Sequence, residues 1–124
     1  MKFTNTDKAP AALGPYSQAV AVNGLLFTSG QIALDPATGE VVGTNVQEQA
    51  EQVMKNLGAV LEANGLTYTD AVKTTCFLAD MNDFAAFNEI YGKYFTAKPA
   101  RSCVAVKTLP KNMLCEVEVI AEMK

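Results

Sequence analysis

Hydrophobic positions cluster in two short runs near the N-terminus, residues 19–22 and 25–29, whose residue types and length are typical of β-strands. Asn23 and Gly24 lie between the runs, and this dipeptide is a strong signal for a two-residue hairpin turn. Residues 71–79 predict a further strand, because they contain the β-branched pair Thr74 and Thr75. Its two alternating sets of side chains are Val72, Thr74, Cys76 and Leu78 on one face, and Lys73, Thr75 and Phe77 on the other.

Two other segments have the apolar spacing of amphipathic helices. The first spans about residues 46–64, with Asn45 as the expected N-cap and Gly65 as a stop signal. The second spans about residues 82–95, and Asn88 lies one turn beyond Phe84, beside its apolar stripe. That stripe consists of Phe84, Phe87, Ile90, Tyr91, Tyr94 and Phe95.

The C-terminal part has two more alternating runs, residues 101–106 and 114–121, separated by a loop with proline and asparagine. We predict that these runs are strands that pair as a hairpin. Arg101 and Cys103 would then share a sheet face with Glu116 and Glu118. From the pattern alone, such an Arg–Glu arrangement is more often an ion pair than a catalytic site, and an exposed pair contributes only about 0–1 kcal/mol.

The element order, ββαβαββ, predicts an α+β fold in which two helices pack on one face of a mixed sheet. The other face of this sheet would carry too many apolar side chains to remain exposed to water. This pattern favours an oligomer that buries the face.

The composition narrows the class of protein to which this sequence can belong. The 124 residues are enough for one domain, and a chain with 49% hydrophobic and 19% charged residues is globular. A net charge of −3 argues against a nucleic-acid partner. The sequence has no apolar run of membrane-spanning length, and residues 1–8 have no apolar signal core, so we expect a cytoplasmic protein without a membrane partner.

The sequence contains no histidine, which excludes Ser-His-Asp and Cys-His mechanisms and histidine metal sites. Its three cysteines, Cys76, Cys103 and Cys115, lack metal-type spacing and are expected to be free thiols. Acid–base chemistry must therefore use carboxylates, tyrosine, lysine, cysteine or water. The sequence also has no phosphate-binding loop and no dinucleotide fingerprint.

Six segments carry a more specific signal, and Pro-Ala-Arg-Ser-Cys-Val at residues 99–104 is the most specific of them. The others are residues 14–19, 28–31, 49–57 and 83–88, together with Leu109-Pro110. In this order and spacing they resemble the RidA/YjgF family of enamine/imine deaminases over nearly the whole chain, which implies a single domain of that type over residues 1–124.

The resemblance implies a chorismate-mutase-like fold and a homotrimer with its sites in clefts between subunits. It implies hydrolysis of 2-iminobutanoate and 2-iminopropanoate to 2-oxo acids and ammonia, without a metal or organic cofactor. These imines arise from the 2-aminocrotonate and 2-aminoacrylate that pyridoxal-phosphate-dependent dehydratases release. The protein would thereby prevent 2-aminoacrylate from inactivating pyridoxal-phosphate enzymes.

The resemblance also implies the site residues. Arg101 would bind the substrate carboxylate through its planar fork, and Glu116 would position the attacking water. The backbone carbonyl of Cys103 would be a second acceptor for that water, while its thiol would have at most a minor role. The remaining substrate-binding residues would be Tyr16 and Asn88, together with Ser29 through its hydroxyl and Gly30 through its backbone N–H. The pattern of the strand by itself does not decide between Glu116 and Glu118.

Two other functions stay open at this point. A trimer that binds 2-oxo acids for regulation would need Arg101 but not Glu116. Cleavage of RNA or inhibition of translation is described for relatives, and the acidic net charge argues against it here.

Overall fold

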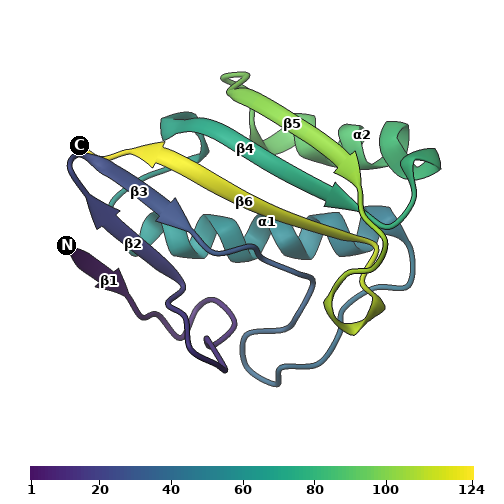
Figure 1. The fold of residues 1–124 in the computed structure, drawn as a ribbon, viewed down its shortest axis with the longest axis horizontal. Helices are drawn as coiled ribbons and strands as arrows, with labels where there is room; N and C mark the ends of the chain where they lie inside the picture. The colour runs from purple at the N-terminus through teal and green to yellow at the C-terminus, as the bar shows by residue number, and fades with distance from the viewer.

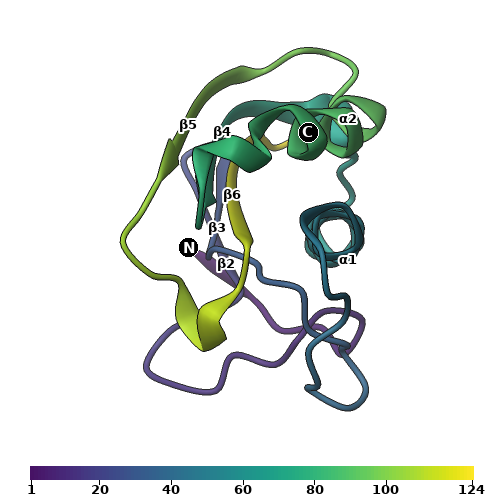
Figure 2. The ribbon, with the colours of Figure 1, turned by 90° about the vertical axis from the view of Figure 1, so that its right-hand side faces the viewer.

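The computed structural model describes residues 1–124 and consists of a six-stranded mixed sheet with both helices on one face (Figures 1 and 2). Across the sheet the strand order is β1-β2-β3-β6-β4-β5. All neighbouring strands are antiparallel except β4 and β5, which are parallel. The strands are β1 (Lys2–Thr4), β2 (Ala19–Val22), β3 (Leu25–Thr28), β4 (Ala71–Leu78), β5 (Ala100–Ala105) and β6 (Cys115–Glu122). The predicted α+β class is confirmed.

The N-terminal hairpin forms as predicted. Strands β2 and β3 pair through Val22 and Leu25, and Asn23 and Gly24 both have positive φ values, of 50° and 79°. Asparagine and glycine tolerate this left-handed backbone better than other residues, which is why the dipeptide specifies the turn.

Both predicted helices are present. Helix α1 (Val46–Glu62) is capped by Asn45, whose side chain accepts the Glu48 N–H. Helix α2 (Phe84–Tyr94) begins later than predicted, because a short 3₁₀ turn, Met81–Asp83, precedes it. The core lies between these helices and the sheet, and its largest fully buried side chains include Phe87, Leu26, Met54, Leu57 and Leu61.

The predicted C-terminal hairpin is wrong. Strand β6 does not pair with β5, since β4 lies between them and pairs with both. Helix α2 connects β4 to β5, and a helical crossover of this kind joins parallel neighbours. The loop after β5 then carries the chain past β4, so that β6 enters the sheet between β4 and β3.

This topology reverses the predicted relation between the charged side chains. Arg101 is opposite Thr74 of β4, which is opposite Val119 of β6. Arg101 and Cys103 therefore lie on the helix-covered face, whereas Glu116 and Glu118 lie on the other face, because directly paired residues point to the same side of a sheet.

Strand β1 was not predicted. It has only three residues at the edge of the sheet, which are too few for an alternating pattern to be recognised in the sequence.

The sheet face opposite the helices is open in the single chain, in agreement with the apolar pattern noted in the sequence. The side chains of Phe3, Phe27 and Val104 on it are 61%, 41% and 48% exposed. We call this surface the outer face and the surface beneath the helices the inner face. Neither helix is long and apolar enough to cross a bilayer.

Candidate functional site

The residues expected to form one site lie in two places in the chain. Tyr16, Ser29, Gly30 and Glu116 line a cavity on the outer face, which we call the outer cavity. Arg101 and Asn88 line another, beside α2 and the edge strand β5, which we call the arginine cavity. The prediction that Arg101 and Glu116 share a sheet face within one chain is therefore wrong, since the hairpin on which it depended does not form.

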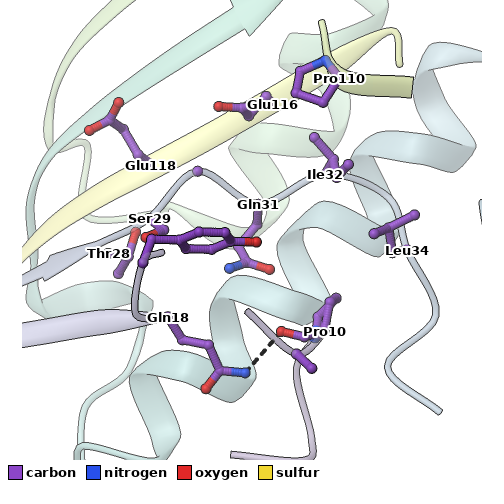
Figure 3. Close-up of a pocket in the computed structure, with 13 residues that line it drawn as sticks. Pro10, Gln18, Thr28, Ser29, Gln31, Ile32, Leu34, Pro110, Glu116 and Glu118 are labelled. Carbon is purple, nitrogen blue, oxygen red and sulfur yellow. Dashed lines mark hydrogen bonds between the residues drawn. The ribbon is translucent and has the colours of Figure 1, made fainter. Parts of the chain in front are cut away.

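The outer cavity has a volume of about 500 Å³ and lies where β3 ends against β6 (Figure 3). Its walls combine polar groups of the strands with apolar side chains of the loops. The further residues that line it are Pro10, Ala11, Gln18, Thr28, Gln31, Ile32, Leu34, Pro110 and Glu118.

A β-bulge places Gly30 at this cavity. The pairing of Phe27 with Ile120 is followed by that of Gln31 with Val117, so four steps along one strand match three along the other. Ser29 and Gln31 donate their N–H groups to backbone carbonyls, whereas the Gly30 N–H has no acceptor in the chain. It is therefore free to donate to a ligand. Bulges of this kind are common next to active sites.

Gly30 lies very close to the side chain of Glu116. A side chain on Gly30 would overlap the carboxylate of Glu116. The free N–H and the carboxylate are thus immediate neighbours. Ser29, in contrast, already donates its hydroxyl to the Ser17 carbonyl at 2.5 Å, so its oxygen faces a ligand mainly as an acceptor.

Two carboxylates project from β6 at this cavity, those of Glu116 and Glu118 (Figure 3). Burial, and secondarily the charge of Glu118, raises the pKa of the Glu116 carboxyl. A raised pKa makes the carboxylate a better proton acceptor. The Glu116 carboxylate lies where a side chain on Gly30 would be, so the structure distinguishes the two glutamates by position, which the strand pattern did not.

Buried amide side chains hold the loops of the outer cavity in place. Gln18 accepts the Thr6 N–H and donates to the carbonyls of Thr6 and Pro10. Asn56 donates to the carbonyls of Ile32 and Leu34. These two roles could not be predicted from the sequence, because a lone Gln or Asn in an apolar pattern gives no sign of its distant backbone partners.

The arginine cavity presents a guanidinium group without a carboxylate partner. Nη1 of Arg101 donates to Oδ1 of Asn88 at 2.7 Å, and this is the side chain's only hydrogen bond. The two ion pairs of the chain, Lys93–Glu51 and Lys124–Asp70, do not involve it. The other four N–H donors of the guanidinium are thus free for an anion, and its planar fork suits a carboxylate.

Aromatic rings flank this guanidinium. Cζ of Arg101 lies 5.4 Å from the ring centroid of Phe84 and 4.7 Å from that of Tyr91. Both rings belong to the buried stripe predicted for the second helix. The signal for the additional contact was the spacing of Phe84, Asn88 and Tyr91, which places all three on one helix face.

Cys103 contributes a half-buried thiol beside Cys76, which is directly opposite it on β4. Burial raises the pKa of the Cys103 thiol, and Arg101 offsets this only in part, so the thiol is not an activated nucleophile. The backbone of Cys103 is more available. Val106 donates its N–H to Leu78 of β4, and strand alternation then directs the carbonyl of Cys103 to the open edge.

The two cavities are chemically complementary. One offers a fork for a carboxylate, and the other offers an N–H donor and a proton acceptor. No group of three or more His, Cys, Asp or Glu side chains is arranged to hold a metal ion.

The chain is similar to known proteins over nearly its whole length. The family model described as Endoribonuclease L-PSP matches residues 6–123. Reactive Intermediate Deaminase A, chloroplastic, of Arabidopsis thaliana is 53% identical over 123 residues, which cover 98% of this chain and 66% of that protein. The 2-iminobutanoate/2-iminopropanoate deaminase of Mus musculus is 50% identical over 121 residues, covering 97% of this chain and 90% of its own.

Solved structures match at the level of the whole fold. E. coli TdcF with bound serine has a TM-score of 0.94 and 43% sequence identity, and the match covers 100% of both chains. RidA from an Antarctic Psychrobacter has a TM-score of 0.94 and 42% identity, covering 99% of this chain and 100% of that one.

Proposed function

Because the chain belongs to the Endoribonuclease L-PSP family, which includes reactive intermediate deaminase A, we propose that it is a 2-iminobutanoate/2-iminopropanoate deaminase. The observation that carries this proposal is the guanidinium of Arg101, which has no carboxylate partner and four free donors in an open cavity. Such a group is suited to the carboxylate that every 2-imino acid contains.

In the proposed reaction, Arg101 binds the substrate carboxylate and Glu116 accepts a proton from water as the water oxygen attacks the imine carbon. The C=N double bond becomes a single bond, and Glu116 returns the proton to the nitrogen, which gives a neutral carbinolamine. Glu116 then takes the hydroxyl proton and passes it to the nitrogen as the C–N bond breaks, so that the hydroxyl becomes the carbonyl of a 2-oxo acid and ammonia leaves. Proton transfer of this kind typically increases the reaction rate about 10²- to 10⁴-fold.

Other residues complete the proposed site. The free Gly30 N–H and the Ser29 hydroxyl bind polar atoms of the substrate, and the Cys103 carbonyl helps to hold the water. Tyr16, which is 55% exposed, covers the cavity from the N-terminal loop. Asn88 orients Arg101.

We also propose a homotrimer in which the arginine cavity of one chain meets the outer cavity of its neighbour. Arg101 and Glu116 lie on opposite sheet faces, so one chain alone does not bring them to one substrate. The exposed apolar side chains of the outer face give such an assembly a surface to bury. The substrate would come from pyridoxal-phosphate-dependent dehydratases in the cytoplasm.

A trapping assay tests the activity. A threonine dehydratase generates 2-iminobutanoate, semicarbazide competes for it, and semicarbazone formation is followed by absorbance. We expect the protein to suppress semicarbazone formation. Unchanged trapping, combined with measurable binding of 2-oxobutanoate, would instead indicate a regulatory binding protein.

Glu118 is expected to set the lower pH limit of this activity. The charge of Glu118 helps to raise the pKa of Glu116, so Glu118→Gln should lower that pKa. Glu116 would then stay ionised at lower pH, and the acidic limb of the kcat/KM profile should move to lower pH, by up to about one unit. Glu122→Gln, on the same strand but outside the cavity, is the control. A limb that moves to higher pH, or does not move, would contradict this role.

A further inference from the structure

The contacts of Arg101 reach beyond the residues assigned to the reaction. Tyr91 lies under the guanidinium, with its ring centroid 4.7 Å from Cζ. Its own hydroxyl is within 2.7 Å of the Thr74 hydroxyl, and Tyr91 and Thr74 are 8% and 0% exposed. The two hydroxyls are therefore buried partners that water does not replace.

The position of Thr74 explains how its contact with Tyr91 affects Arg101. In the parallel register of β4 and β5, Thr74 is the residue directly opposite Arg101. The Tyr91 ring comes from α2, yet its hydroxyl is fixed to the strand residue that neighbours the arginine backbone. Three elements thus meet at one guanidinium, and the ring is held in a fixed place relative to it.

Two further aromatic rings pack against Tyr91. Tyr91 stacks on Phe95 at 4.8 Å and contacts Phe87 at 5.9 Å between ring centroids. Burial raises the pKa of the Tyr91 hydroxyl, so the phenol stays neutral and keeps its proton for the hydrogen bond.

Asn88 alone does not fix the fork. One hydrogen bond to Nη1 lets the guanidinium pivot about that atom. The rings of Phe84 and Tyr91 restrict this rotation and leave the edge of the fork free for a ligand. A donor group held in its binding orientation loses less conformational entropy when the ligand arrives.

We propose that Tyr91, anchored by Thr74, is a positioning residue that holds the Arg101 fork in the orientation that binds the substrate carboxylate. This inference rests on the proposed function for the role of Arg101. It predicts an effect on binding, seen in KM, without a comparable effect on kcat.

Two tyrosines on the same helix supply a matched test. Tyr91→Leu should raise KM for the imine, and the dissociation constant of 2-oxobutanoate, about tenfold, while kcat stays within about twofold. Tyr94→Leu removes the same group from α2, but Tyr94 contacts Tyr68 and Glu51 rather than Arg101. It should lower the melting temperature and leave KM unchanged. Equal changes in KM for both variants would overturn the proposal.

Milder variants keep the test decisive if Tyr91→Leu does not fold. Tyr91→Phe and Thr74→Val each remove one partner of the hydroxyl pair, and each should raise KM about threefold. The double variant should raise KM no further, because both changes remove the same contact. Wild-type KM in both single variants, or additive effects in the double variant, would overturn the proposal.

The 2-oxobutanoate measurement separates this inference from the proposed activity. If wild type binds 2-oxobutanoate without hydrolysing the imine, the deaminase assignment fails. Weaker 2-oxobutanoate binding by Tyr91→Leu would still support the positioning role in that case. If Arg101→Ala binds 2-oxobutanoate as tightly as wild type does, Arg101 does not hold the carboxylate, and the positioning role is overturned with it.

Discussion

Arg101→Ala is expected to lower kcat/KM for 2-iminobutanoate about 10²- to 10³-fold, the loss that follows from removing two charge-assisted hydrogen bonds to a carboxylate. Arg101 has no ion-pair partner in the chain, so its removal leaves no buried acidic group uncompensated. The trapping assay measures the effect, and the melting temperature shows whether the variant is folded.

Two control variants separate the effect of the planar guanidinium of Arg101 from the effect of positive charge alone. Arg101→Lys keeps the positive charge but loses the planar, bidentate geometry, and we expect it to remain at least about tenfold below wild type. Lys98→Ala removes another cation that lines the same cavity, and it should have little effect. Wild-type kcat/KM in Arg101→Ala, or an equal loss in Lys98→Ala, would contradict carboxylate binding by Arg101.

Local signals in the sequence were sufficient for most of the fold. Asn23-Gly24 specified a turn because its backbone angles exclude most other residues, and Asn45 specified a helix start through a hydrogen bond three residues away. These interactions are short in sequence, so a pattern along the chain contains them.

Strands that are neighbours in the sheet, in contrast, can be far apart in the sequence. Residues 101–106 and 114–121 looked like a hairpin because they are consecutive, but β4, some thirty residues upstream of β5, separates them. The decisive feature was the helix between β4 and β5, which brings a strand back parallel to its predecessor. That one error placed Arg101 and Glu116 on the same face instead of opposite faces.

The candidate site, too, could be predicted only in part from the sequence. The side chains and the Gly30 N–H could be named from the resemblance, whereas the bulge that leaves this N–H free is defined only by the register of β3 against β6. The ring of Tyr91 was assigned to the core, and its contact with Arg101 depends on how α2 packs over β4 and β5.

The separation of Arg101 from Glu116 leads to a prediction that a site contained in one chain would not share. Arg101→Ala and Glu116→Gln should each be nearly inactive alone, yet should regain activity when the two variants are unfolded and refolded together. In a closed ring, each site takes its arginine from one chain and its glutamate from the next. With equal, random mixing, about half of the chains supply each intact group, so about a quarter of the sites are complete.

A second mixture makes the result quantitative. Wild type refolded with an equal amount of the double variant, Arg101→Ala with Glu116→Gln, should have about a quarter of wild-type activity if sites lie between chains, but about half if each chain holds a whole site. The native mass of the refolded protein gives the number of chains in the ring. No recovery in the first mixture, with half activity in the second, would place both residues in one chain's site and would require β5 or β6 to rearrange from the sheet described here. Recovery to about a quarter in both would mean that the substrate is held by the fork of one chain and hydrolysed by the carboxylate of its neighbour.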